Sequence, residues 1–223
     1  MNKPLVSVRN LQVDFHNEDG AHPAVRGISF EIAAGKCLGI VGESGSGKSV
    51  TSLALLGLLP PAPDCQVRGE VWFEGQDLRR LPAADMRALR GSGISMIFQE
   101  PMTSLNPAFT IGEQIIEKIR THERVGARAA RARALDLLGE VRISAPERRI
   151  DEYPHRLSGG MRQRAMIAMA LACRPRLLIA DEPTTALDVT IQAQILELLK
   201  QLQEDHDMAI VLVSHNLGVI AEL

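Results

Sequence analysis

The sequence predicts an α/β fold with a mostly parallel sheet, an antiparallel β region near the N-terminus and an inserted helical region. Two observations support this prediction. Continuous apolar runs alternate with helical segments in the second half of the chain, which is typical of parallel sheets buried on both faces. A glycine-rich turn at residues 42–49 also joins an apolar run to a helix, as at the ligand-binding edge of such sheets.

Alternating segments predict the antiparallel strands. Leu11, Val13 and Phe15 alternate with polar residues, and residues 27–32 and 67–73 continue the same pattern. A period of two places one apolar face on a core and leaves the other face in solvent. We therefore expect an N-terminal antiparallel β-subdomain.

Apolar runs and helical spacing assign the remaining elements. The expected strands of the parallel sheet are 38–41, 94–98, 177–180 and 209–214. The expected helices are 52–59, 111–121, 127–141, 159–173 and 191–205. We expect residues 100–158 to form a helical subdomain, inserted between the two parts of one core at 1–99 and 159–223.

Composition and charge limit the class of protein. The chain has 223 residues, of which 45% are hydrophobic, so it can bury a large core, and its net charge of −2 gives no general attraction for nucleic acid. Cys37, Cys65 and Cys173 lack metal-ligand spacing, which predicts structural thiols in a reducing compartment. Residues 1–10 lack the apolar core of a signal peptide, and no apolar run is long enough to span a membrane. At a membrane we would expect a peripheral subunit.

The glycine-rich turn fits the pattern GxxxxGK[ST] without a mismatch. It consists of Gly42, Glu43, Ser44, Gly45, Ser46, Gly47, Lys48 and Ser49, and Val50 follows it. Glycines let the backbone amides turn toward phosphates at a helix N-terminus. Lys48 should reach the β- and γ-phosphates of a nucleotide, and the Ser49 hydroxyl should ligate Mg²⁺. An ordinary glycine-rich turn is the alternative, but the strand before it and the helix after it favour phosphate binding.

Polar residues follow three of the expected parallel strands. Asp181 and Glu182 come after 177–180, whereas Gln99 and His215 come after two other strands. Asp181 would hold Mg²⁺ directly or through water, and Glu182 would polarise the water that attacks the γ-phosphate. The Gln99 carbonyl oxygen could bridge metal and water, and His215 could contact the γ-phosphate and orient Glu182. Each residue alone also fits a solvated strand end, but their shared position favours one site.

A second glycine-rich turn, at residues 157–161, opens the expected helix 159–173. Ser158 and the amides of Gly159 and Gly160 would form a further anion site at a helix N-terminus. One chain rarely needs two phosphate-binding surfaces for one nucleotide.

Together these motifs resemble the ATP-binding subunits of ABC transporters over essentially the whole chain. The corresponding motifs are Walker A at 42–49, the Q-loop at Gln99, the signature at 157–161, Walker B at 177–181, the D-loop at 186–188 and the switch at His215. The resemblance implies a P-loop NTPase core that hydrolyses ATP with Mg²⁺. It also implies that two subunits face each other head to tail, so that the signature of one closes over the ATP of the other.

The resemblance implies residue roles as well. Glu182 would be the general base, and Asp188 would communicate between the two sites. Gln99 and Ser49 would join Asp181 around Mg²⁺. The family usually stacks an aromatic residue of the first strands on adenine, and Phe15 is the candidate by position, although core packing fits it equally well.

A finer resemblance is to importers of dipeptides, oligopeptides, glutathione or nickel complexes. It is carried by Gln99–Pro107, Tyr153–His155 and Ala180–Thr190. It implies a second ATPase subunit, identical or paralogous, an extracytoplasmic solute-binding protein, and two transmembrane permeases contacted through Glu100–Pro107. The chain would then be peripheral, at the cytoplasmic face of the inner membrane.

Other functions stay compatible with the motifs. One is a soluble ABC ATPase that acts as an ATP-gated clamp on nucleic acid or ribosomes, and another is a nucleotide-binding module without turnover. The clamp is less favoured because the segment between Gln99 and Ser158 is too short for the long coiled coil of DNA-repair members, and only one cassette is present. Arginines 120, 124, 128, 131 and 133 alternate with alanine, which fits a solvated helix face, so no nucleic-acid partner is expected. Because the family usually continues beyond the position of Leu223, we expect an incomplete, exposed sheet edge. The polypeptide would then be less stable than a full-length subunit, or it would be a fragment of one.

Overall fold

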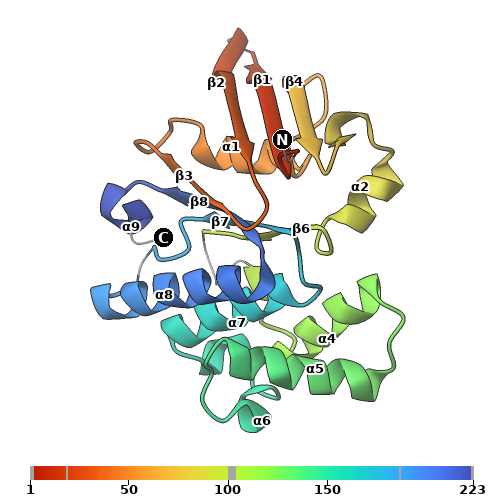
Figure 1. The fold of residues 1–223 in the computed structure, drawn as a ribbon, viewed down its shortest axis with the longest axis vertical. Coiled ribbons are helices and arrows are strands. Elements are labelled where there is room, and N and C mark those ends of the chain that lie inside the picture. The colour runs from red at the N-terminus through yellow and green to blue at the C-terminus, as the bar shows by residue number, and fades with distance from the viewer. Residues whose placement is uncertain (1–2, 19, 100–103, 186, 222–223) are drawn as a thin grey trace.

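The structure is a computed structural model that describes residues 3–18, 20–99, 104–185 and 187–221. Its strands form two four-stranded sheets. In Figure 1 the antiparallel sheet lies at the top, the parallel sheet crosses the middle, and most of the helices lie below. This arrangement confirms the predicted α/β class.

The antiparallel sheet has the strand order β2-β1-β4-β5. Its strands are β1 (Val6–Asn17), β2 (Gly20–Ile32), β4 (Cys65–Phe73) and β5 (Gln76–Asp77). The register of β1 shifts between Val8 and Leu11, where Asn10 has a φ of 47°. This irregularity lets Val8 and Leu11 both face the core despite their odd spacing. The predicted strands are therefore present, and β1 and β2 are longer than the alternation indicated.

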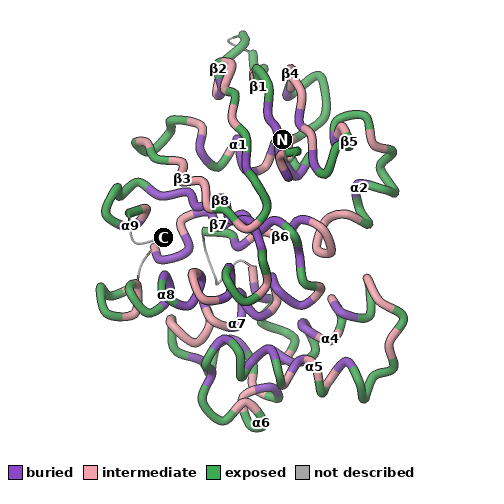
Figure 2. The backbone as a smooth tube through the Cα atoms, viewed as in Figure 1, coloured by how far each residue is buried: buried purple, intermediate pink, exposed green. Residues whose placement is uncertain are grey.

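The parallel sheet has the strand order β3-β8-β7-β6. Its strands are β3 (Cys37–Val41), β6 (Ile94–Ile97), β7 (Leu177–Asp181) and β8 (Ala209–Ser214). Every residue of β7 and β8 is buried (Figure 2). In β7, Leu177 and Ile179 pack on the side of the antiparallel sheet, while Leu178 and Ala180 pack on the opposite side. Burial on both faces explains why these strands are continuous apolar runs.

Helices cover both faces of the parallel sheet. They are α1 (Lys48–Leu55), α2 (Ala83–Leu89), α4 (Ile111–His122), α5 (Ala127–Glu140), α6 (Pro146–Arg149), α7 (Gly159–Leu171), α8 (Val189–His206) and α9 (Leu217–Ala221), with 3-10 turns η1 (Leu78–Arg80) and η2 (Pro154–Arg156). Helices α7 and α8 lie on one side, and α1 lies on the other (Figure 1). The helix expected at 52–59 is corrected, because it begins at Lys48 and ends at Leu55. Gly47 at its N-cap and Gly57 beyond its end both adopt positive φ, which helical residues do not.

Helices α4 and α5 pack together beside α7 and belong to the same apolar core as α8. Ile111, Ile115 and Ile119 of α4 are almost fully buried at helical spacing. The Thr110 side chain caps the helix and forms a reciprocal pair with Glu113. These elements follow β6 in sequence and precede α7.

Two arginines of the predicted basic run are paired with acids. Arg131 donates to both carboxylate oxygens of Asp151, at 2.9 and 2.8 Å, and Arg133 lies 2.6 Å from a carboxylate oxygen of Glu123. Within the parts of the chain that the structure describes, no helix combines the length and the apolar character needed to cross a membrane.

Candidate functional site

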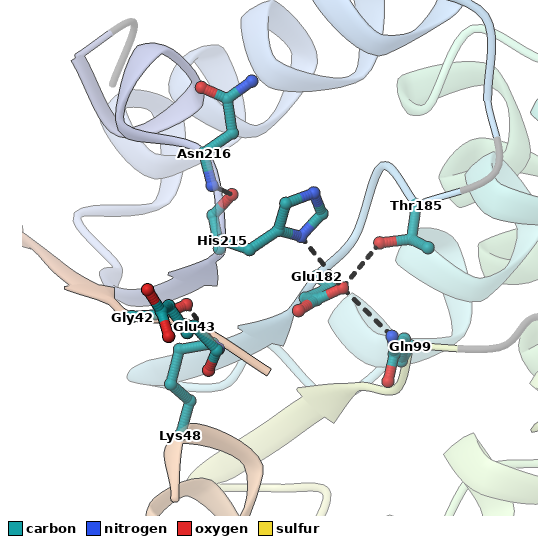
Figure 3. A network of polar contacts seen from close by, with 9 residues as sticks. Gly42, Glu43, Lys48, Gln99, Glu182, Thr185, His215 and Asn216 are labelled. Atoms are coloured by element: carbon teal, nitrogen blue, oxygen red, sulfur yellow. Dashed lines mark hydrogen bonds and ion pairs between the residues drawn. The ribbon is translucent and has the colours of Figure 1, made fainter. Parts of the chain in front are cut away.

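The carboxyl ends of the parallel strands lie in register. Val41 of β3 pairs with Ser214 of β8, Val213 of β8 pairs with Asp181 of β7, and Ala180 of β7 pairs with Ile97 of β6. The glycine-rich turn, His215, Glu182 and Gln99 all follow these ends. The sheet therefore gathers at one edge the residues that the sequence placed after separate strands (Figure 3).

The turn from β3 to α1 depends on its glycines. Gly45 and Gly47 have φ values of 82° and 90°, a region that other residues rarely adopt. A Cβ atom at Gly47 would lie 2.3 Å from the carbonyl oxygen of Ala24 in β2, whereas a Cβ atom at Gly45 would meet nothing within 4 Å. Gly47 is therefore needed both for conformation and for space.

Lys48 is buried within this turn, with 7% of its surface exposed. Its Nζ donates to the carbonyl oxygens of Gly42, at 2.7 Å, and Glu43, at 2.8 Å (Figure 3). A buried ammonium group needs such partners, and the contacts hold the cation at the centre of the turn.

Two cavities adjoin the glycine-rich turn. One of about 490 Å³ is lined by residues 23–26, 40–42 and 45–48, and another of about 190 Å³ is lined by residues 44, 45 and 47–50 together with Gln99 and Glu182. Phe15 lines neither of them and packs against the core of the antiparallel sheet. All predicted turn residues except Glu43 therefore border one of these cavities, whereas Phe15 borders neither.

Asp181 is buried, with 4% of its surface exposed. Burial raises the pKa of the Asp181 carboxyl, and a hydrogen bond from Ser49 opposes this effect. The negative charge of Glu182 raises the pKa further, whereas the positive charge of Lys48 lowers it. Its Oδ1 has no hydrogen-bond partner among the described residues. Carboxylate and hydroxyl oxygens are ligands that Mg²⁺ prefers, so this pair fits a magnesium site.

No cluster of three or more His, Cys, Asp or Glu side chains that could hold a metal occurs in the described ranges. Mg²⁺ usually takes one or two protein carboxylates and completes its coordination with water and substrate oxygens, so the single carboxylate of Asp181 with the Ser49 hydroxyl is compatible with its usual ligand set.

Glu182 lies at the centre of a polar network. Its φ of 47° turns the chain sharply out of β7, and its amide donates to the carbonyl oxygen of Val213 at 2.9 Å. Its Oε2 accepts from Gln99 Nε2 at 3.0 Å and from Thr185 Oγ1 at 2.9 Å, and it lies 3.4 Å from His215 Nδ1 (Figure 3). The structure therefore brings together three predicted residues, Gln99, Glu182 and His215.

Thr185 is a member of this network that the sequence did not predict. Its amide donates to the Glu182 carbonyl oxygen at 3.2 Å, so the two residues close a short turn. The only sequence signal was a hydroxyl residue three positions after a strand-end carboxylate.

The second glycine-rich turn begins α7, as predicted. Ser158 is the N-cap, and its Oγ accepts from the Met161 amide at 3.3 Å. Cβ atoms at Gly159 and Gly160 would lie 3.6 Å from the Leu187 side chain and 3.0 Å from the Ile191 side chain. None of residues 157–161 lines the two cavities at the first turn. The two glycine-rich turns thus border different surfaces of the chain.

Asp188 is the N-cap of α8, and its Oδ1 accepts from the Ile191 amide at 2.9 Å. It therefore starts the helix that supports the second glycine-rich turn. Ala186 of the predicted D-loop lies outside the described residues.

The described part of the segment after Gln99 is tied to α4. Gln114 accepts from the Asn106 amide at 2.9 Å and donates back to the Asn106 carbonyl oxygen at 3.0 Å. Residues 100–103 lie outside the described ranges. Phe98 (42%) and Phe109 (48%), which are near this segment in the sequence, have exposed side chains. Tyr153 (40%) is exposed as well, and it follows Glu152, whose carbonyl oxygen accepts from the Ile111 amide at the start of α4.

A family model described as "ABC transporter" matches residues 25–185. The chain is 56% identical to the glutathione import ATP-binding protein GsiA of Pectobacterium atrosepticum over 99% of its own length and 36% of that protein. It is 53% identical to the oligopeptide transport ATP-binding protein OppD of Bacillus subtilis over 98% of its length and 61% of that protein. The chain thus spans less than two thirds of these relatives.

A solved structure has the same fold. It is described as a dimeric, post-hydrolysis state of the ATP-binding cassette MJ0796 bound to ADP and Pi. The match has a TM-score of 0.85 at 30% identity and covers 97% of this chain and 90% of the other.

Proposed function

The chain belongs to the ABC transporter family, and from this premise we propose that it binds and hydrolyses ATP to power the uptake of peptides or related small solutes. The observation that carries the proposal is the meeting of Gln99, Glu182 and His215 beside the turn that holds Lys48. The names of GsiA and OppD support import, and the ADP and Pi bound to MJ0796 support hydrolysis.

The glycine-rich turn would bind the phosphates of ATP. Its amides lie at the start of α1, where the helix dipole favours negative charge. Lys48 would exchange the Gly42 and Glu43 carbonyl oxygens for the β- and γ-phosphate oxygens. Val50 borders the same cavity. Because Phe15 packs on the antiparallel core, its predicted stacking on adenine gains no support from the described contacts.

Ser49 and Asp181 would hold Mg²⁺, and Gln99, which borders the same cavity as Ser49, would join them. When bound, the ion would neutralise charge on the phosphate oxygens. The unpartnered Oδ1 of Asp181 supports this assignment, because a buried carboxylate oxygen is costly without a partner.

Glu182 would act as the general base. Its carboxylate would accept a proton from water while the oxygen of that water bonds to the γ-phosphorus and the bond to the β–γ bridging oxygen breaks, which gives ADP and phosphate. His215, which is next to Glu182 and mostly exposed, could turn to contact the γ-phosphate.

A second ATPase subunit, identical or paralogous, would complete the site. Ser158, Gly159 and Gly160 border a surface away from the first turn, so their anion site is available to a nucleotide of another subunit. The dimeric state of MJ0796 supports such pairing. Asp188, which starts α8 beside this turn, would relay changes between the two sites.

We also propose two transmembrane permeases, contacted through Glu100–Pro107, and an extracytoplasmic solute-binding protein. The exposed side chains of Phe98, Phe109 and Tyr153 support a docking surface near this segment, because large exposed apolar groups often mark interfaces. The chain would then lie at the cytoplasmic face of the inner membrane. The division into 1–99, 100–158 and 159–223 is likewise a proposal, supported by the position of α4 to α6 between β6 and α7.

The test uses the complex isolated from solubilised membranes through an affinity tag on this chain. We expect permease subunits to co-purify and the complex to hydrolyse ATP. Glu182→Gln should lower kcat by about 100-fold or more and leave ATP binding intact, because it removes the proton acceptor. The exposed Glu197→Gln is the matched control. Unchanged hydrolysis in Glu182→Gln would refute the base assignment, and recovery of RNA or DNA without a permease would support the clamp.

A further inference from the structure

We infer that Thr185 is a positioning residue that fixes the Glu182 carboxylate so that one oxygen is bound by donors and the other accepts the proton of the attacking water. This inference rests on the proposed hydrolysis of ATP. Within the described ranges, the hydrogen bonds and the ion-pair contact of the carboxylate all involve Oε2, which Thr185 Oγ1 approaches to 2.9 Å. In the view of Figure 3 the second oxygen lies on the side of the glycine-rich turn.

The Thr185 contact is local and doubled. Thr185 donates its amide to the Glu182 carbonyl oxygen at 3.2 Å and its hydroxyl to the Glu182 side chain at 2.9 Å. One hydrogen bond joins the two backbones and the other joins the two side chains, and both close the same four-residue turn from Glu182 to Thr185. They restrict the rotation of the Glu182 side chain, which otherwise loses considerable rotamer freedom when it is ordered.

The positive φ of Glu182 makes this support necessary. Its φ of 47° is uncommon for a residue with a side chain, and such conformations persist only where the surroundings enforce them. The hydrogen bond from the Glu182 amide to the Val213 carbonyl oxygen fixes one side of the turn, and the hydrogen bond from the Thr185 amide to the Glu182 carbonyl oxygen fixes the other. The Thr185 hydroxyl then fixes the Glu182 carboxylate as well, through its hydrogen bond to Oε2.

The other two contacts of Oε2 are less able to hold Glu182 during the reaction. His215 is 62% exposed at its side chain and lies 3.4 Å away, and Gln99 is also exposed. In the proposed mechanism His215 could also contact the γ-phosphate, and Gln99 would also help to hold the magnesium ion. Thr185 has neither task, so it is the donor of this described network that can stay on Oε2 throughout.

The division of the two oxygens follows from hydrogen-bond chemistry. A carboxylate oxygen that accepts several donors has its lone pairs occupied, whereas the other oxygen retains lone pairs that can accept a proton. Glu182 also borders the cavity of about 190 Å³ that it shares with Lys48 and Ser49. A carboxylate fixed in this way presents its free oxygen to the space where the γ-phosphate and water would meet.

The experiment measures ATP hydrolysis by the isolated complex with variants of this chain. Thr185→Val keeps the side-chain shape and removes the hydroxyl, and Thr185→Ser keeps the hydroxyl. We expect Thr185→Val to lower kcat by about 10- to 100-fold, because a misplaced catalytic group costs that much, with KM and ATP affinity unchanged. Thr185→Ser should restore kcat to within about threefold of the wild type.

A matched control is Thr121→Val in α4, which also removes one hydroxyl hydrogen bond, to the Glu117 carbonyl oxygen, at a site away from Glu182. It should hydrolyse ATP like the wild type. If Thr185→Val does not fold, Thr185→Ala decides the matter, since it removes the same hydroxyl with no β-branch. In the Glu182→Gln background, Thr185→Val should cause no further loss, because the two residues act as one unit.

Several results would overturn the inference. They are an unchanged kcat in Thr185→Val, a parallel loss of ATP affinity, or no rescue by Thr185→Ser. Failure of the proposed function looks different, because then the wild-type complex does not hydrolyse ATP or Glu182→Gln is fully active.

Discussion

Replacement of Lys118 by Met should alter the pH dependence of stability. Lys118 projects from α4 toward the parallel sheet, where its Nζ donates to Ser95 Oγ of β6 at 3.0 Å and to the Ala170 carbonyl oxygen of α7 at 3.4 Å. Burial lowers the pKa of Lys118 to about 8 from 10.5, and the charge of Cys173 partly opposes this effect. The amine is thus held where its charged form is disfavoured.

The sign of the effect follows from proton binding. Below about pH 8 the amine is protonated in both the folded and the unfolded chain, so the folded state carries the cost of a buried cation. Between about pH 8 and pH 10.5 the unfolded chain binds more protons than the folded chain, and the free energy of unfolding rises with pH. Over the whole pH range the free energy of unfolding should rise by about 3 kcal/mol, and about 2 kcal/mol of this rise should occur between pH 8 and pH 10.

The assay is urea unfolding of this chain followed by circular dichroism, at constant ionic strength, from pH 7 to pH 10. Lys118→Met keeps the apolar stem and removes the titrating amine. Relative to this variant, we expect the wild type to gain about 2 kcal/mol of unfolding free energy between pH 8 and pH 10. Replacement of the exposed Lys36 by Met is the control, and its unfolding free energy should depend on pH as that of the wild type does. Parallel pH profiles for the wild type and Lys118→Met would refute the reasoning.

Two further predictions concern the glycine-rich turns. Ser158→Arg should leave ATP binding to the isolated chain nearly intact and abolish hydrolysis in the assembled pair. A fluorescent ATP analogue measures the binding, and an ATPase assay measures the hydrolysis. Loss of ATP binding to the isolated chain would mean that the signature acts within its own chain. Gly45→Ala should cost about 1 kcal/mol of unfolding free energy from positive φ alone. Gly47→Ala should cost about 1 to 3 kcal/mol more, because its Cβ would collide with the Ala24 carbonyl oxygen at 2.3 Å, and equal losses in urea unfolding would contradict this.

The strand-end residues could be predicted from sequence because each follows a run that is apolar without interruption. Burial on both faces requires apolar residues at every position of the strand, and the carboxyl ends of parallel strands meet at one edge of the sheet. Gln99, Glu182 and His215 could therefore be assigned to one site before their distances were known. The strands near the N-terminus were predictable because apolar and polar residues alternate where only one face of a strand is buried.

Thr185 could not be predicted in this way. Its contact with Glu182 depends on a turn in which Glu182 adopts a positive φ, and no periodic pattern encodes that conformation. The short helices α2, α6 and α9 were missed as well, because a helix of one or two turns shows too little of a repeat to stand out. The position of Phe15 relative to the turn likewise depended on how the two sheets pack.

The aligned strand ends have a consequence for where this chain can change in length. One residue added within β8 would advance His215 by about 3.3 Å and turn its side chain to the opposite face of the sheet. The same holds for β3, β6 and β7, since each is hydrogen-bonded in register to a neighbour that carries its own part of the site. The ends of β1 and β2 that are joined to each other lie at the top of Figure 1, away from this edge, and have no such restriction. Insertions of sequence, whether natural or engineered, should therefore be tolerated between β1 and β2 and excluded from the strands of the parallel sheet.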